Sequence, residues 1–298
     1  MEKLNVTYRR RIEQVIEYIN NNLDQSLTLN QLAQVACFSP YHFHRIFVAV
    51  TDETVNNFTN RMRLEKGVRL LKFSKVSVLN IALETGFSSA ATFSRSFKQY
   101  FGLTAMEFRK KGNLRNSKIG KDLHLVKPYL AAMNVSKDQQ NFHIKLKTLP
   151  RRRVAFIRVM NSFRKRVVLQ AYERMITWAK RIGIYDSETI FGMSLDDIMT
   201  TPKSKYRYDV CMPIPNTLVV QADFISTMYI PNCKYATTLV SGDINRVTAA
   251  FYYLYEGWLI NSSYEPEHQQ AIEIFRDKDN VCNWDHFELE LCIPIKSF

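Results

Sequence analysis

Two aromatic-rich segments carry the side chains best suited to chemistry, FSPYHFHRIF at residues 38–47 and FSSAATFSRSFKQYF at residues 87–101. At a helical period the phenylalanines of each segment fall on one stripe, and the polar residues fall on the opposite face. The outward residues are Tyr41, His44, Arg45 and Val48 in the first segment and Ala91, Thr92, Arg95, Lys98 and Gln99 in the second. An exposed helix face of this kind can enter the major groove of DNA, where arginine pairs with guanine and lysine or glutamine contacts phosphates or bases.

Residue types with catalytic or metal-binding chemistry show no productive spacing. His42 and His44 are two residues apart on a predicted helix, so they do not share a metal-binding face. The sequence contains no HExxH, GxSxG or phosphate-loop motif. The five cysteines have no CxxC spacing, which disfavours a zinc site or a disulfide framework and favours a reducing cytoplasm. We therefore expect no metal, no cofactor and no enzymatic activity.

The 298-residue chain has a formal net charge of +13, concentrated in its first half. Residues 1–112 contain 16 Lys and Arg against 9 Asp and Glu, residues 113–153 contain 10 against 2, and residues 154–298 contain 15 against 17. A basic region beside a near-neutral one is typical of a polyanion-binding module joined to a second domain. No apolar run reaches the roughly 18 residues of a membrane-spanning helix, and the first residues show no secretory signal.

The elements that must position the outward residues form two copies of one pattern, a short helix, a three- or four-residue turn and a second helix, which together make a helix-turn-helix. In the first copy, Thr28 and Gln31 have the spacing of a capping box, and Pro40 suits the first turn of the second helix. An amphipathic helix precedes this copy, with its apolar stripe at Ile12, Val15, Ile16, Ile19 and Leu23.

The two copies indicate an internal duplication, because aligning FHRIF with FSRSF also aligns Phe58 with Phe108. The segment between them, TVNNFTNRMRLEKGVRLLKF, is predicted to be one helix of about 27 Å, at about 1.5 Å per residue. Such a helix would hold the two copies about one turn of DNA apart. Gly67 within it costs up to about 1 kcal/mol relative to alanine, so we interpret it as a point of close helix packing.

The segment IALETGFSSAATFSRSFKQYFGLTAMEFRK resembles the signature of the AraC/XylS family of bacterial transcription regulators, and the resemblance covers residues 8–111. It implies an all-α DNA-binding domain at residues 1–112, with two helix-turn-helix units in successive major-groove segments. By similarity, contacting positions fall on Tyr41, His44 and Arg45 in the first unit and on Ala90, Ala91, Thr92 and Arg95 in the second. Asp52 replaces the usual glycine after the first recognition helix, where aspartate tolerates left-handed backbone, and Ala105 replaces a usual proline.

Residues 113–141 are polar, basic and aperiodic, so we interpret them as a linker to a mixed domain at residues 142–298. This domain contains two strand–helix–strand–strand patterns. The first begins with FHIKLKTLPRRRVAFIRVM, which we predict to be one long or bent strand. The two patterns end alike, in VCMPIP and LCIPIK, so Cys211 aligns with Cys292 when the two are superimposed. Two β-α-β-β repeats predict an antiparallel sheet with helices and a cleft between the halves that could take a small molecule. The expected fold class is multidomain, all-α followed by α+β.

The pieces PRRRVAFIRV, YRYDVCMPIP, GWLINS and AIEIFRD resemble the GyrI-like (gyrase-inhibitory-protein-like) effector domain found in multidrug-sensing regulators. By similarity, the acidic ligand-contacting residue of that family falls on Glu273. Ala271, Glu273 and Phe275 alternate to one face of the predicted strand. A carboxylate beside an aromatic ring suits an organic cation, and Trp258 and Tyr229 are further candidate walls of the site.

Together these observations predict a cytoplasmic, two-domain bacterial transcription regulator that binds double-stranded DNA and senses a small molecule, a hydrophobic cation. The resemblance adds RNA polymerase as a candidate partner, and no membrane is expected. Two alternatives remain open at this point. The second domain could hydrolyse a small molecule with Glu273 as a base, or it could be a protein-contact module joined to a DNA-binding domain.

Overall fold

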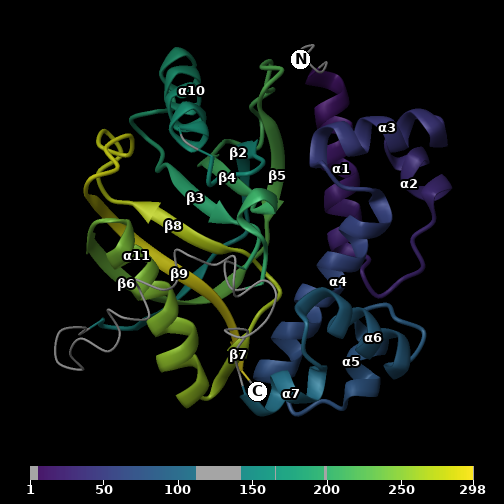
Figure 1. The fold of residues 1–298 in the computed structure, drawn as a ribbon. Helices are drawn as coiled ribbons and strands as arrows, with labels where there is room; N and C mark the ends of the chain where they lie inside the picture. The colour runs from purple at the N-terminus through teal and green to yellow at the C-terminus, as the bar shows by residue number, and fades with distance from the viewer. Residues whose placement is uncertain (1–5, 112–141, 165, 198–199, 298) are drawn as a thin grey trace. The chain divides into compact units, whose positions relative to one another are not determined.

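The computed structural model describes residues 6–111, 142–164, 166–197 and 200–297, so the predicted linker at residues 113–141 lies outside the described residues (Figure 1). By the contacts within the chain it divides into two compact units, Met1–Asp122 and Leu123–Phe298. The first is helical and the second combines helices with a sheet, as the predicted fold class requires.

The first unit consists of helices α1 to α7 in the order that the sequence predicts. Their bounds are α1 Val6–Asn21, α2 Leu29–Val35, α3 Pro40–Thr51, α4 Val55–Phe73, α5 Val78–Glu84, α6 Ala90–Phe101 and α7 Ala105–Lys111. The predicted capping box at α2 is confirmed, since the Gln31 N–H donates to the Thr28 hydroxyl and the Gln31 side chain accepts from the Thr28 N–H. Serine and threonine caps also begin α4, α5 and α6.

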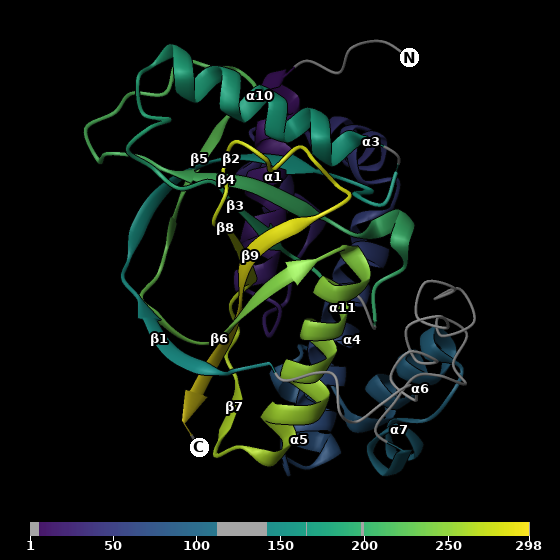
Figure 2. The same ribbon diagram turned by 90° about the vertical axis from the view of Figure 1, so that its left-hand side faces the viewer.

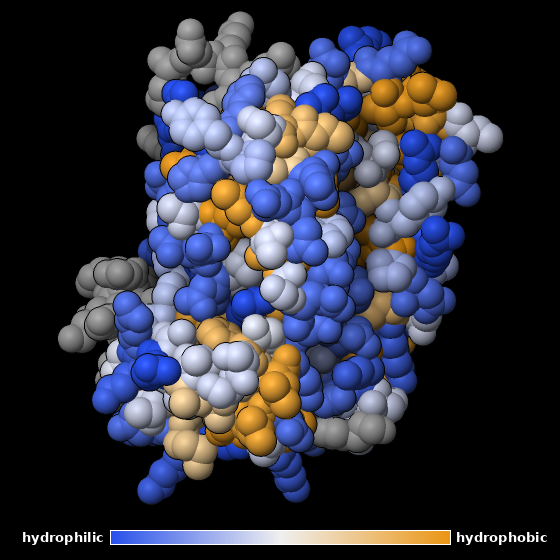
Figure 3. Space-filling view, turned by 90° about the vertical axis from the view of Figure 1, so that its right-hand side faces the viewer, coloured by the Kyte–Doolittle hydropathy of each residue, from blue (hydrophilic) through white to orange (hydrophobic). Residues whose placement is uncertain are grey.

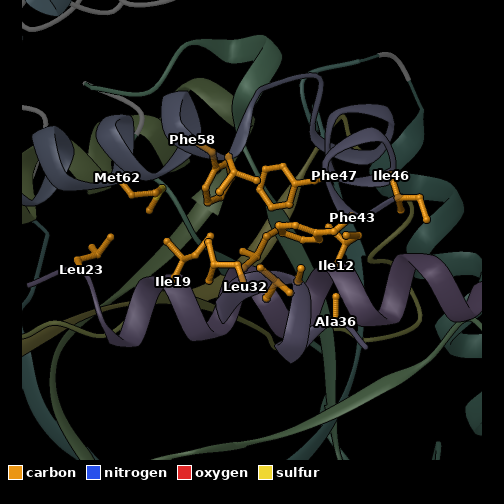
Figure 4. Packing of buried hydrophobic residues seen from close by; sticks show 14 residues of the cluster. Ile12, Ile19, Leu23, Leu32, Ala36, Phe43, Ile46, Phe47, Phe58 and Met62 are labelled. Atoms are coloured by element: carbon orange, nitrogen blue, oxygen red, sulfur yellow. The ribbon is translucent and has the colours of Figure 1, made fainter. Parts of the chain in front are cut away.

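The stripe of α1 packs under the first helix-turn-helix and forms its core (Figure 4). Ile12 and Ile19 of α1, Leu32 of α2 and Phe43 and Phe47 of α3 are fully buried, and Phe58 and Met62 of α4 close the cluster. Burying a side chain of this size contributes about 1.5–3 kcal/mol. The predicted apolar stripes are therefore the interior of this unit.

The second copy repeats this construction, with Phe93, Phe97 and Phe101 of α6 fully buried. A Cβ added to Gly67 would lie 2.7 and 2.9 Å from two ring atoms of Phe93, which confirms the predicted close contact of α4 with α6. After the two recognition helices, Asp52 and Gly102 both adopt the left-handed backbone that ends a helix. The predicted tolerance of aspartate for this backbone is confirmed.

The turns inside the two copies differ in one respect that the sequence did not predict. Cys37 and Gly86 occupy the equivalent left-handed position, with φ of 52° and 76°. The N-cap of the following helix is Ser39 in the first copy and Ser89 in the second, so the second turn is one residue longer. A cysteine with positive φ is strained where glycine is not.

Helix α4 is buried on more sides than its predicted apolar stripe. Arg61 is 3% exposed, and its guanidinium forms salt bridges with Glu53 and Glu65, both at 3.2 Å. Because an unpaired charge in such a position would be costly, the two carboxylates are needed to keep Arg61 inside. The helix therefore combines apolar packing with a buried ionic network.

Among the described residues of the second unit, the strands form one antiparallel sheet of nine strands, in the order β1-β6-β9-β8-β3-β4-β2-β5, with β7 paired to β9 (Figure 2). The strands are β1 Lys145–Leu149, β2 Arg152–Val159, β3 Phe191–Ser194, β4 Tyr208–Pro213, β5 Ser226–Ile230, β6 Cys233–Gly242, β7 Tyr264–Pro266, β8 Ala271–Phe275 and β9 Phe287–Ser297. The helices are α10 Val167–Arg181 and α11 Ile244–Tyr252, and α11 continues into a π-helical turn at Tyr253–Trp258.

The segment predicted to be one long or bent strand at the start of this unit is two separate strands. The segment forms β1 and β2, which pair with different halves of the sheet, β1 with β6 and β2 with β4 and β5. Pro150 lies between them and has no N–H to donate to a ladder. The chain therefore changes partners at this residue.

The two predicted β-α-β-β repeats are confirmed by the register of the sheet. Phe191 of β3 pairs with Cys211 of β4, and Ile272 of β8 pairs with Cys292 of β9 in the same way. In the strands, a residue of the first half thus corresponds to one 81 positions later, as Cys211 does to Cys292. Strands β1 and β5 are exchanged between the halves, so the strand order is symmetric about the contact of β3 with β8.

The helices follow the same symmetry. Helix α10 packs on β2 and β4, and α11 packs on β6 and β9, so the central strands β3 and β8 lie between the strands that the two helices cover (Figure 2). Among the described residues, no helix is long and apolar enough to cross a membrane. The same residues contain no group of three or more His, Cys, Asp or Glu side chains able to hold a metal ion.

Candidate functional site

The outward face of α3 brings the predicted residues of the first copy together. Tyr41 is 74% exposed, and His44 and Arg45 are also exposed. The guanidinium carbon of Arg45 lies 5.8 Å from the centre of the Tyr41 ring, within the range of a cation–π interaction. Because Phe43 and Phe47 anchor the opposite face of the helix in the core, the exposed side chains have a fixed orientation toward solvent.

The outward face of α6 is built differently. Ala91, Arg95, Lys98 and Gln99 are exposed, and Ala90 is partly buried. At the position equivalent to Tyr41 the second copy has Ala91, so Arg95 has no ring at that place. Both copies nonetheless present one arginine at the same position of the second helix, which is the feature that the duplication preserves.

Thr92 has a local role that the sequence reading missed. Its hydroxyl accepts from the Ser89 N–H at 3.2 Å and donates to the Ser89 carbonyl at 2.8 Å, which completes a capping box at the start of α6. The Ser-x-x-Thr spacing was the available signal. The hydroxyl of Thr92 therefore uses its donor and one acceptor position in the helix cap.

The surface seen in Figure 3 is mostly hydrophilic, with smaller hydrophobic groups between the polar ones. On the helical unit the large exposed apolar side chains include Tyr41, Leu79, Leu83 and Met106. A mainly polar surface with exposed arginines suits contact with the phosphates and base edges of DNA.

The second candidate site is centred on Glu273, at the symmetry point of the sheet. Glu273 of β8 pairs with Gly192 of β3, and the two are equivalent residues of the two halves. The Tyr208 hydroxyl of β4 donates to the Glu273 carboxylate at 2.6 Å, and the Tyr208 and Tyr172 hydroxyls are 2.9 Å apart. Strands from both halves and helix α10 thus converge on one carboxylate.

Gly192 is what allows this arrangement. A Cβ at this position would overlap the Tyr208 hydroxyl and lie 2.9 Å from the Tyr172 hydroxyl. The absence of a side chain at Gly192 therefore leaves the space through which the Tyr208 hydroxyl reaches the Glu273 carboxylate. Gly192, Tyr208 and Tyr172 were not predicted from the sequence, although the 81-residue repeat, extended from the cysteines, would have paired Gly192 with Glu273.

The electrostatics of the site favour a cation. Burial raises the pKa of Glu273, and the hydrogen bond from Tyr208 partly opposes that rise. Burial also raises the pKa of Tyr172 and Tyr208 well above the ordinary value, so both phenols are neutral donors. No salt bridge to Glu273 occurs among the residues that the structure describes. A carboxylate in this setting is costly to keep ionised without a cationic partner.

The predicted aromatic neighbours divide into two groups. Phe275 lies on the same strand and face as Glu273, and its ring is edge-on to Tyr172, with centroids 5.4 Å apart. Trp258 instead stacks on Tyr264 at 6.0 Å beyond the end of α11. Tyr229 lies on β5, four strands from β8, where it stacks with Arg151. The structure therefore joins Phe275 to Glu273 but does not bring Tyr229 there.

Comparison with known proteins matches each unit separately. Residues 142–296 match the GyrI-like small molecule binding domain, and residues 32–111 match a helix-turn-helix domain. The chain is 36% identical over 99 residues to the Transposon Tn10 TetD protein of Escherichia coli, covering 33% of this chain and 72% of that protein. It is 30% identical over 105 residues to the probable transcription factor PqrA of Proteus vulgaris, covering 35% and 86%. Among solved structures, the EcmrR C-terminal domain aligns with a TM-score of 0.41 at 15% identity, over 53% of this chain and 100% of that one.

Proposed function

We propose that the effector of this protein is a hydrophobic organic cation held at Glu273. The premise is that the chain belongs to the AraC family of DNA-binding transcription regulators and carries a GyrI-like small-molecule binding domain. The supporting observation is the Glu273 carboxylate, which has a tyrosine donor but no cationic partner among the described side chains. Charge attraction from the carboxylate and the faces of Phe275 and Tyr172 would act on the same ligand.

The alternative of hydrolysis at Glu273 finds less support. The nearest hydroxyls belong to Tyr208 and Tyr172, whose pKa values are raised by burial, so neither is an activated nucleophile at neutral pH. Of the relatives named above, PqrA is described as a probable transcription factor. The arrangement therefore suits binding better than turnover.

For the helical unit, we propose that α3 and α6 read two segments of DNA, through Tyr41, His44 and Arg45 in the first and Arg95, Lys98 and Gln99 in the second. At 1.5 Å per residue, the 19 residues of α4 extend over about 28 Å, comparable with the spacing of successive major grooves. One chain would then cover about 20 base pairs of asymmetric DNA, which footprinting combined with mass measurement of the complex can test. The proposal also includes the domain limits 1–112 and 142–298, a cytoplasmic location and RNA polymerase as a partner.

The effector proposal is tested by calorimetry with benzyltriethylammonium as the probe cation and its uncharged carbon analogue as the matched neutral compound. The cation should bind the wild-type protein at micromolar strength or weaker, about −8 kcal/mol at best, and the neutral compound should bind at least tenfold more weakly. Glu288→Gln is the control for removing a negative charge elsewhere on the same sheet. Glu288 is an exposed acid, so this variant should keep the preference of wild type for the cation. Equal affinity of the wild-type protein for benzyltriethylammonium and its uncharged analogue would contradict the proposal.

A further inference from the structure

The face of the sheet opposite Glu273 carries a cation that the proposed effector site does not use. Arg152 opens β2, and its side chain projects to the same face as Val154 and Phe156. Its guanidinium carbon lies 4.6 Å from the centre of the Phe191 ring. Because Phe191 directly precedes Gly192 on β3, this ring and the Glu273 site lie on opposite faces of the sheet.

The Arg152 guanidinium lacks hydrogen-bond partners on one defined edge. Its Nε and Nη2 atoms are buried, and neither has a partner in the part of the chain that the structure describes. Glu188 is near enough to favour the charged form, but no salt bridge joins it to Arg152 among the described residues. Burial lowers the pKa of Arg152, the expected direction for a cation that is not neutralised.

The other neighbours of Arg152 cannot supply a negative charge. Cys211, Cys292 and Tyr235 are near enough to act electrostatically on the guanidinium, and burial raises the pKa of each of these groups. All three are therefore neutral at physiological pH. The environment is also apolar, since Phe191, Ile230 and Cys292 belong to the core of this face. An uncompensated guanidinium in such surroundings favours an incoming anion with an apolar body.

A second arginine on the same strand and face, Arg158, binds a carboxylate through the same two donor atoms, Nε and Nη2. Arg158 donates from Nε and Nη2 to the two carboxylate oxygens of Asp209, at 2.9 and 2.7 Å. This is the bidentate geometry in which arginine binds a carboxylate most strongly. The Nε and Nη2 atoms of Arg152 are the same pair of donors, six residues earlier, without a carboxylate.

We propose that Arg152 forms a second ligand site, which binds the carboxylate of a small organic acid on the face of the sheet opposite the cation site. The carboxylate would accept from Nε and Nη2 as Asp209 does from Arg158, and the apolar part of the acid would lie against Phe191. Arg152 is half-buried as a residue, but its Nε and Nη2 atoms are buried, so the acid reaches them only after the side chains that cover this edge move aside. The repeat places Cys233 at the equivalent position of the other half, so the sheet holds one such site.

The test is calorimetric titration of the full chain with benzoate, and with benzamide as the uncharged analogue of the same shape. Wild type should bind benzoate at least tenfold more tightly than benzamide. Arg152→Gln should lose this preference. Arg151→Gln, which removes a neighbouring exposed charge, should keep it. Glu273→Gln should also keep it, because that variant changes the other face only.

Arg152→Lys covers the case in which the glutamine variant does not fold, since lysine keeps the charge but cannot form the two parallel hydrogen bonds. We expect at least fivefold weaker benzoate binding in this variant. The proposal is overturned if wild type shows no saturable benzoate binding, if benzoate and benzamide bind equally, or if Arg152→Lys binds benzoate as tightly as wild type.

Discussion

The two units of this chain are both internal duplications, but they use duplication in opposite ways. In the helical unit the copies are joined by α4, and each presents its own outward helix, α3 or α6, with one exposed arginine. In the α+β unit the copies share one sheet, and equivalent residues meet at its centre, where Gly192 faces Glu273. In the proposed function, the first arrangement would present a DNA-reading surface twice, and the second would form a single ligand site from two unequal halves.

The difference follows from how each core is closed. Each helix-turn-helix buries its own phenylalanines, so its outer face can change independently, as Tyr41 and Ala91 have. In the sheet, β1 and β5 are exchanged, so neither half completes its sheet alone. A substitution at the centre of the sheet therefore affects both halves. The position of the Glu273 carboxylate in one half depends on the absence of a side chain at Gly192 in the other.

Gly192→Ala should have the largest effect, because it removes the asymmetry at the centre of the sheet. The new methyl group would overlap the Tyr208 hydroxyl, so the donor to Glu273 must move. We expect cation affinity to fall at least 100-fold and stability to fall by about 1–3 kcal/mol, the usual cost of overpacking. Calorimetry and chemical denaturation measure the two effects. Gly257→Ala is the control, since its nearest neighbour would be the Tyr253 ring at 3.1 Å. Unchanged affinity in Gly192→Ala would show that Tyr208 is not part of the site.

Arg45→Ala and Arg95→Ala test whether the two outward helices are both used. Each should weaken specific DNA binding by about 1–3 kcal/mol if each arginine reads a base, and neither should reduce folding stability, since both are exposed. Gel-shift titration with specific and scrambled DNA separates base reading from phosphate contact. Lys75→Ala, an exposed cation outside α3 and α6, should cause only a small, sequence-independent loss. If one arginine variant is neutral, that copy does not read bases.

Gly67→Ala tests the contact that holds the second copy against α4. Helix propensity alone would make this change stabilising by up to about 1 kcal/mol. The Phe93 ring atoms at 2.7 and 2.9 Å from the added Cβ should reverse the sign, for a net loss of about 1–2 kcal/mol in the free energy of unfolding. Adding Phe93→Leu should recover part of the loss. A stabilised Gly67→Ala protein would contradict the close packing.

The pH dependence of cation binding should be the smallest of these effects. Because burial raises the pKa of Glu273, the carboxyl group is protonated at a higher pH than an exposed glutamate. Cation affinity should therefore fall as pH decreases through this raised pKa, by up to about tenfold per pH unit. The folding stability of the ligand-free protein has the opposite pH dependence. Glu273 contributes stability at low pH, and this contribution is lost as pH rises through its folded pKa. Glu273→Gln should bind weakly and without this pH dependence; the same pH profile in both proteins would exclude Glu273 as the titrating group.

The sequence predicted what depends on local patterns. Capping residues, apolar stripes and the left-handed Asp52 are encoded within a few residues, and all are present in the structure. The split between β1 and β2 was missed, because strand partners lie far away in the chain. The tyrosines around Glu273 were missed for the same reason, since Tyr172 and Tyr208 come from a helix and a strand of the other half. Alternating patterns cannot indicate which residues meet across a sheet.

The central claim is that the duplicated sheet holds one cation site, at Glu273, while the duplicated helical unit presents two reading helices. Calorimetric titration with benzyltriethylammonium at neutral pH, for wild type and Glu273→Gln, tests it most directly, since glutamine keeps the shape of glutamate and removes its charge. The account predicts one bound cation per wild-type chain and an affinity at least tenfold lower in the variant. Two cations per chain, or equal binding by both proteins, would contradict it.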